Sequence, residues 1–208
     1  MEQISLRNEL YRKILHFFLI LIPIAYCYLG KWTSLIIFAS IATVVVSLDY
    51  MRRKNPKIKI IFEKIFGVVL RHHELEGDKL CGASFVAIAT CVNFLFFKKE
   101  IAVTGFSILV ISDAMAAIVG RNFSSGQFFE KSIAGASAFF ITGLMVLITC
   151  GMIFHVKSWF YVFGLLALFA VTIIESRPSL FKVDDNLTIP LGFSIIMTMF
   201  DVMWNYTL

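Results

Sequence analysis

The sequence predicts an all-α, polytopic membrane protein, a helical bundle of about seven transmembrane helices plus one interfacial amphipathic helix. The 208 residues are 59% hydrophobic and 16% charged, with a mean hydropathy of +0.83, whereas soluble domains are usually about half apolar and about a quarter charged. Apolar stretches long enough to cross a bilayer alternate with short polar segments. Because no polar segment has room for a soluble module, we expect one integral-membrane domain over residues 1–208.

The expected spans follow from the rule that a transmembrane helix needs roughly 17 to 25 apolar residues. They cover residues 13–30, 33–50, 80–97, 101–120, 132–154, 158–176 and 187–206. Basic residues precede the first stretch, but no small-residue cleavage site follows it, so we expect a retained helix rather than a signal peptide. Pro178 helps to end the sixth span, and Pro190 is expected in the first turn of the seventh.

The polar segment from Arg52 to Lys79 separates the second and third spans. Within it, apolar side chains repeat at helical spacing, at Ile58, Ile61, Phe62, Ile65, Phe66 and Val69. This pattern is typical of an amphipathic helix that lies in the membrane interface.

The basic residues indicate an orientation. Of the 19 lysines and arginines, 15 fall in the segments on the N-terminal side of the membrane and four in the others. The positive-inside rule then places the N-terminus in the cytoplasm and the C-terminus on the opposite side. The net charge of +5 is explained by anionic lipid headgroups near these segments, so we expect no nucleic-acid partner.

The acids gather on the same side, although the rule does not require it. Of 14 acidic residues, only Glu100 and Asp201 fall on the far side. Asp113 lies about two turns inside a span, where a carboxylate costs about 2.5 to 3.5 kcal/mol and is normally functional or paired. Small residues surround it and let another helix or a ligand approach closely: Ala114, Ala116, Ala117 and Gly120.

Lys131 and Ser132 follow a Ser- and Gly-containing turn and begin a helix. The free amide groups and the dipole of a helix N-terminus favour an anion, and the lysine adds a point charge, so a phosphate fits there. The Gly-x-x-x-x-Gly-Lys frame of a Walker A loop is missing. An ordinary lysine at the membrane edge is an equally good interpretation of Lys131 alone.

Glu175 lies in the last turn of the sixth span, where the helix dipole disfavours an anion, so a metal ion or another cation is its expected partner. Asp184, Asp185 and Asn186 fall at or just before the start of the seventh span, where a helix cap is the alternative role. Oxygen ligands of this kind suit magnesium that bridges nucleotide phosphates. Arg12 and His16 share a helical face. The alternative role of Arg12 is that of a snorkelling membrane anchor, and the alternative role of His16 is that of a packed or hydrogen-bonded side chain.

Together these residues resemble the family of CTP-dependent lipid-alcohol kinases, which includes dolichol, phytol and yeast-type diacylglycerol kinases. The resemblance covers most of the chain and rests on these segments: Arg12-Lys13 with His16, Arg71 to Ala83, Ser112-Asp113-Ala114 with Gly120-Arg121, Lys131-Ser132, and Glu175 with Asp185 to Pro190. The last of these segments is the most specific. The chain departs from the family pattern at Ser124, where a glycine is common, and at Ala134, where a glutamate is common.

The resemblance implies that the protein transfers the γ-phosphate of CTP to a membrane lipid alcohol with Mg²⁺ as cofactor. The implied catalytic residues are Asp113, Lys131, Glu175 and Asp185. The implied ligands of the nucleotide and its phosphates are Arg12, Lys13, His16, Arg121, Lys131, Ser132 and Asn186. The implied metal ligands are Asp113, Glu175 and Asp185, any of which also suits the role of proton acceptor. Polyprenol, phytol, farnesol and diacylglycerol all remain open as substrates.

Two other functions compete with this interpretation. A CTP:phosphatidate cytidylyltransferase shares the Asp-x-x-Ala, Gly-Arg and lysine-containing stretches, but usually ends in a Pro-Gly-His-Gly-Gly signature, where this chain reads Asp185 to Pro190. A membrane transporter uses buried acids for ions, but its polar groups are expected to reach both sides of the bilayer, whereas here they gather on one.

Overall fold

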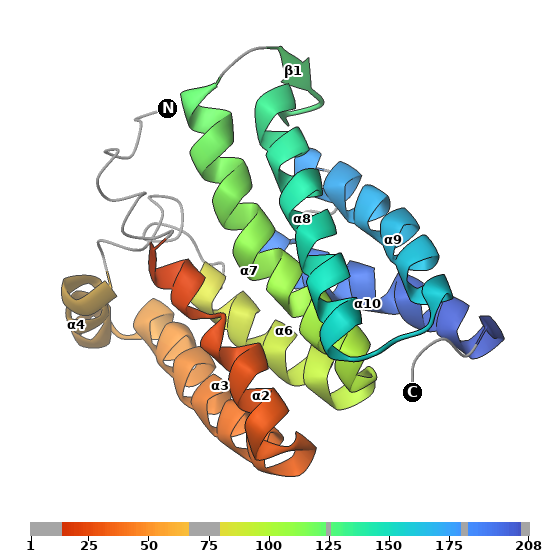
Figure 1. Ribbon diagram of the computed structural model, residues 1–208. Coiled ribbons are helices and arrows are strands. Elements are labelled where there is room, and N and C mark those ends of the chain that lie inside the picture. The colour runs from red at the N-terminus through yellow and green to blue at the C-terminus, as the bar shows by residue number, and fades with distance from the viewer. Residues whose placement is uncertain (1–13, 67–79, 124–125, 180–182, 205–208) are drawn as a thin grey trace.

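The computed structural model describes residues 14–66, 80–123, 126–179 and 183–204. Its helices are α2 (Leu21–Leu29), α3 (Lys31–Lys54), α4 (Pro56–Phe66), α6 (Gly82–Phe96), α7 (Lys99–Asn122), α8 (Ile133–Ile153), α9 (Ser158–Ser176) and α10 (Asp185–Trp204). An antiparallel pair of two-residue strands, β1 (Gln127–Phe128) and β2 (Lys131–Ser132), lies between α7 and α8. Figure 1 shows this hairpin at the end of the bundle where α7 ends and α8 begins.

The expected multi-pass helical bundle is confirmed as a fold class. Five helices, α3, α7, α8, α9 and α10, are long and apolar enough to cross a membrane. The apolar helices Ile14–Leu29 and Gly82–Phe96 occupy two more of the predicted spans but are shorter. The count of seven spans therefore stays a prediction.

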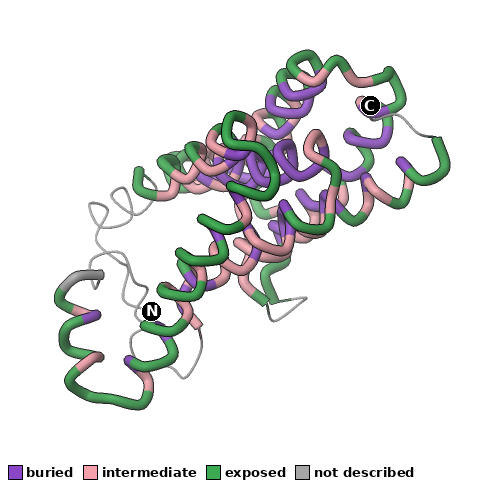
Figure 2. The backbone as a smooth tube through the Cα atoms, turned by 90° about the horizontal axis from the view of Figure 1, so that it is seen from below, coloured by how far each residue is buried: buried purple, intermediate pink, exposed green. Residues whose placement is uncertain are grey.

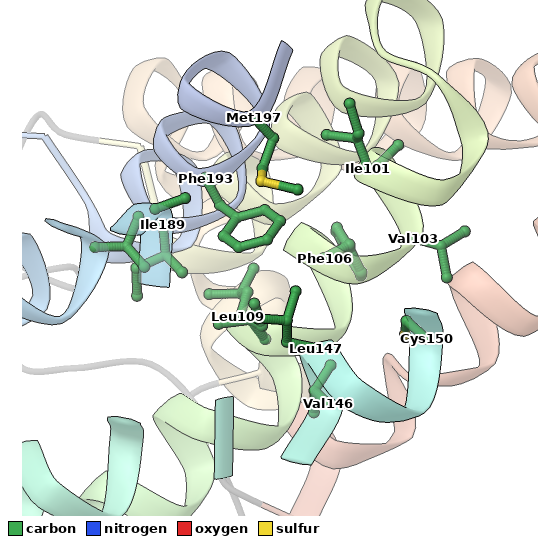
Figure 3. Packing of buried hydrophobic residues seen from close by; sticks show 14 of the residues in the cluster. Ile101, Val103, Phe106, Leu109, Val146, Leu147, Cys150, Ile189, Phe193 and Met197 are labelled. Atoms are coloured by element: carbon green, nitrogen blue, oxygen red, sulfur yellow. The ribbon is translucent and has the colours of Figure 1, made fainter. Parts of the chain in front are cut away.

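Helix α7 forms the centre of the bundle. Every residue from Ile101 to Val110 is buried, because α8, α10 and α6 pack around this part of the helix. Figure 3 shows Phe106 and Leu109 of α7 beside Leu147 of α8 and Phe193 of α10. The outward faces of the surrounding helices are exposed (Figure 2), as expected where lipid takes the place of water. The core thus holds α7 as a fixed support for Asp113.

The expected close approach at the small residues of α7 is confirmed. A Cβ atom added to Gly120 would lie 2.9 Å from Ser132 Oγ and 3.1 Å from the Cα atom of Gly135. A Cβ atom on Gly135 would lie 3.1 Å from the carbonyl oxygen of Ala116. Small residues let two membrane helices approach in this way, and here they bring the end of α7 against the start of α8.

Helix α4 accounts for part of the expected amphipathic helix, and its position in the membrane interface stays a prediction. The Phe62 side chain is buried, with the Arg52 guanidinium 4.9 Å from its ring centre. Ile61, which the spacing placed on the same face, is instead exposed. Val69 lies outside the described residues.

Polar contacts fasten α10 to the α6–α7 hairpin. Ser194 Oγ donates to Asn93 Oδ1 at 2.7 Å, and Asn93 Nδ2 donates to the carbonyl of Ala102 at 2.8 Å. Lys98 and Asp201, which the sequence predicts on the same side of the membrane, form an ion pair at 2.8 Å. These contacts fix the helix whose first turn carries Asp185.

Candidate active site

Lys131 lies at the centre of a cluster of acids. Its ammonium pairs with Glu175 Oε1, and Asp185 Oδ2 lies 3.6 Å from the same nitrogen. The three residues come from β2, the last turn of α9 and the first turn of α10. The structure therefore joins three predicted site residues that are up to 54 positions apart in the sequence.

A tight hairpin delivers Lys131 to this position. Gly126 has a φ of 72°, a left-handed conformation that glycine adopts without steric cost. After the hairpin, Ser132 caps α8, since its Oγ accepts a hydrogen bond from the amide of Gly135 at 3.1 Å. The same hydroxyl donates to the carbonyl of Gly120 at 3.2 Å. The cap is thus a structural role of Ser132, and its phosphate role stays a prediction.

Glu175 is almost fully buried, with 1% of its side chain exposed, and Lys131 supplies the cation that its place at a helix C-terminus predicts. Burial lowers the pKa of Lys131, but the neighbouring carboxylates of Glu175 and Asp185 outweigh it, with a smaller contribution from Asp113. The pKa of Lys131 consequently lies above its usual value. The raised pKa favours the charged form of Lys131, and its side chain is 30% exposed, so this cation is reachable from solvent.

The structure separates the roles of the two adjacent aspartates. Asp184 Oδ1 accepts hydrogen bonds from the backbone amide of Asn186 at 3.0 Å and from its side-chain amide at 2.6 Å. Asp184 is therefore the cap of α10, whereas Asp185 faces Lys131. Because the cap precedes residue 185, the helix begins earlier than predicted, and Pro190 lies in its second turn. The expected first-turn position of Pro190 was wrong.

Asp113 has a polar neighbour, as its depth in α7 predicts. His16 Nε2 lies 3.7 Å from Asp113 Oδ2 and 3.5 Å from the carbonyl oxygen of Leu109. The two side chains are 12% and 17% exposed, so His16, in the apolar helix Ile14–Leu29, covers Asp113 without sealing it. Arg121 is exposed in the last turn of α7, and Arg12 and Lys13 lie outside the described residues.

The carboxylates near Lys131 are the ligand type that magnesium prefers, but those that the structure describes do not form a complete set of metal ligands. Within the described ranges, no three or more histidine, cysteine, aspartate or glutamate side chains are grouped to hold a metal ion. Glu175 and Asp185 do converge on one point, the ammonium of Lys131. Magnesium in phosphoryl-transfer sites is usually held by one or two carboxylates plus substrate phosphates and water, and this pair of carboxylates fits that pattern.

Sequence reasoning missed a second charged cluster, at the junction of α3 and α6. Asp49 is fully buried and accepts hydrogen bonds from Arg52 Nε at 2.6 Å, the amide of Cys81 at 2.8 Å and Ser84 Oγ at 2.6 Å. Arg52 is 2% exposed. The signal was an Asp-x-x-Arg pair across the end of a span, since residues three apart share a helix face and an acid and a base there can pair.

Comparison with known proteins gives matches of modest identity. No protein family and no solved structure matches the chain. An uncharacterized protein of Rickettsia prowazekii is 28% identical over 190 residues, which are 91% of this chain and 93% of that protein. The CTP-dependent diacylglycerol kinase 1 of Saccharomyces cerevisiae is 25% identical over 177 residues, covering 74% of this chain and 59% of the kinase.

A probable chloroplastic phytol kinase of Zea mays is 27% identical over 169 residues, covering 74% of this chain and 55% of that protein. The chain thus spans little more than half the length of these two named kinases. Both of these named relatives are kinases of lipid alcohols. The chain is accordingly a weak, partial homologue of kinases named for diacylglycerol and phytol.

Proposed function

We propose that this protein transfers the γ-phosphate of CTP to the hydroxyl of a membrane lipid alcohol at the cytoplasmic face. One observation carries the proposal: a charged, partly exposed lysine lies among acids at one end of an apolar bundle. Phosphoryl transfer needs positioning and charge neutralisation more than covalent chemistry, and this cluster offers both. The similarity to lipid-alcohol kinases supports the same reaction class.

The position of each side chain suggests its role. Lys131 binds the phosphates of the nucleotide, since its raised pKa keeps it charged and its exposed part faces water. Asp113 lies nine residues before the end of α7, about 14 Å at a rise of 1.5 Å per residue. This depth supports its assignment as the acceptor of the proton of an alcohol that arrives from the bilayer. Arg121 adds positive charge at the exposed end of the same helix.

Magnesium, held by Glu175 and Asp185 with Asp113 nearby, would add charge neutralisation on the phosphates. The protein's own contribution is to hold Lys131 and the carboxylates in one fixed arrangement, with Glu175 buried. Charged groups aimed in advance at a developing charge lower the barrier without reorganisation during the reaction.

The test uses the purified protein in lipid nanodiscs with γ-labelled CTP or ATP and a panel of polyprenol, phytol, farnesol and diacylglycerol. We expect a labelled lipid phosphate together with CDP, faster turnover with CTP than with ATP, and loss of turnover in EDTA. Release of pyrophosphate with a cytidylylated lipid would instead identify a cytidylyltransferase. Equal or better turnover with ATP would contradict the nucleotide assignment, and full turnover in EDTA would contradict the metal assignment.

The cytoplasmic placement has its own test. Gln127 and Arg177 are both exposed at the Lys131 end of the bundle. Each is replaced in turn by a single cysteine in a cysteine-free background. We expect an impermeant thiol reagent to reach both from the cytoplasmic side, and to reach cysteines at Lys31 and Lys157 from the other. Labelling of positions 127 and 177 from opposite sides would contradict a shared face.

A further inference from the structure

The hairpin that carries Lys131 is fastened to the end of α9 by contacts outside the acid cluster. The amide of Glu130 donates to the carbonyl of Ser176 at 3.0 Å. Ser179 Oγ donates to Glu130 Oε1, and the amide of Ser179 donates to Glu130 Oε2 at 3.4 Å. We call the Glu130–Ser176–Ser179 contacts the hairpin clasp.

An aromatic contact supports the clasp on one side. The Arg177 guanidinium lies 4.7 Å from the ring centre of Phe129, within the range of a cation–π interaction. Phe129 has a φ of 54°, a left-handed conformation that is unfavourable for a bulky residue and persists only where surrounding contacts hold it. The hairpin thus adopts a bend that its contacts with α9 help to maintain.

The clasp has a direct geometric consequence for Lys131. Glu130 and Lys131 are adjacent, and so are their respective partners, Ser176 and Glu175. The hydrogen bond between the backbone groups of Glu130 and Ser176 therefore sets the register in which Lys131 pairs with Glu175. On the other side, Ser132 is fixed by the cap of α8. Lys131 is thus held between two fixed points, the clasp and the Ser132 cap. The sequence predicted a site role for Ser132 but none for the residues of the clasp.

We propose that Glu130, acting through Ser179, is a positioning residue that sets the place of the Lys131 ammonium relative to Glu175 and Asp185. This inference rests on the proposed function, in which that ammonium binds the nucleotide phosphates. Glu130 is exposed, and its hydrogen bonds go to Ser179, so its carboxylate acts through the hairpin rather than on the substrate. Both of its carboxylate oxygens accept hydrogen bonds from Ser179.

The variants Glu130→Ala and Glu130→Gln separate acceptor from charge. Glu130→Ala removes the two hydrogen bonds from Ser179 but keeps the backbone hydrogen bond to Ser176. We expect kcat to fall about tenfold with little change in the KM for the lipid, since small misplacements of a reacting group can cost up to about a hundredfold. Glu130→Gln keeps the acceptor for Ser179 Oγ and loses only the longer hydrogen bond from the Ser179 amide, so we expect it to restore most of kcat. Gln127→Ala, an exposed change in the other strand of the hairpin, is the matched control with unchanged kcat.

A second readout does not depend on catalysis. A cysteine placed at position 131 in a cysteine-free background reports access to the site through its rate of reaction with a charged thiol reagent. We expect Glu130→Ala to raise that rate about tenfold and Glu130→Gln to leave it unchanged. Equal rates in all three backgrounds, or a kcat for Glu130→Ala equal to that of the control, would overturn the positioning role. Absence of kinase turnover in the unmodified protein would overturn the proposed function instead, and the thiol rates would still test the clasp.

Discussion

The Lys131 cluster and the Asp49 cluster both bury a carboxylate beside a basic side chain, yet they differ in how the charges are matched. Asp49 has a guanidinium, an amide and a hydroxyl on its two oxygens, and it is closed off from solvent. Lys131 is one cation shared between Glu175 and Asp185, and it is partly exposed. A sealed and balanced cluster holds helices together, whereas an open cluster with excess acid has capacity for a further cation.

The largest effect on stability is expected at the sealed cluster. Asp49→Ala removes the partner of a buried arginine and leaves the amide of Cys81 and the hydroxyl of Ser84 without their acceptor. Breaking a buried ion pair costs about 3 to 5 kcal/mol. We expect a much lower midpoint of thermal unfolding in detergent, with near-normal turnover per folded molecule. A stable Asp49→Ala variant with lost turnover would make this cluster part of the catalytic machinery and end the contrast.

The largest effect on turnover is expected at the open cluster. Lys131→Ala removes the charge that the phosphates need, and we expect kcat to fall about a hundredfold or more. Because this variant also leaves Glu175 unpaired, Lys131→Arg is the better-controlled partner: it keeps a cation beside Glu175 but replaces a compact ammonium with a planar guanidinium. We expect Lys131→Arg to unfold at nearly the original temperature and still to lose most of its turnover.

The control for both lysine variants is Lys31→Ala, which changes an exposed lysine at the start of α3. Its turnover and unfolding midpoint should match those of the unmodified protein. Near-normal turnover in Lys131→Ala, measured per folded molecule in the nanodisc assay, would remove the acid cluster as the active site and return the transporter interpretation to contention.

The sequence predicted the helices better than it predicted their ends. The apolar stretch 158–176 coincides with α9, because a run of apolar residues closed by a proline leaves little choice. The start of α10 was placed two residues late, because several adjacent polar residues, Asp184 among them, were equally good caps.

The candidate site shows the same division. Lys131 stood out at an expected helix start that favours an anion, Glu175 at a helix end that disfavours one, and Asp185 as an oxygen ligand. The structure brings the three together. That the ammonium lies between the two acids depends on the strands β1 and β2, which at two residues each are too short to leave a pattern in the sequence. Glu130 escaped notice for a related reason, because an acid in an exposed turn resembles any solvated charge until its partner is known.

The smallest expected effect comes from Asp184, and its neighbour Asp185 provides a comparison of the two kinds of role within one turn of α10. Asp184→Ala removes a cap and should cost ~1 kcal/mol of stability, with turnover per folded molecule nearly unchanged. Asp185→Ala removes a carboxylate that faces Lys131 and should lower kcat about a hundredfold with a smaller shift in the unfolding midpoint. Asp184→Asn preserves the cap, since asparagine caps helices as well as aspartate does, and should be silent in both measurements. Thermal unfolding and turnover of these three variants, measured on the same preparations, decide the matter: if Asp184→Ala and Asp185→Ala lost stability and turnover in equal proportion, the two residues would form one structural unit and Asp185 would have no separate role in the reaction.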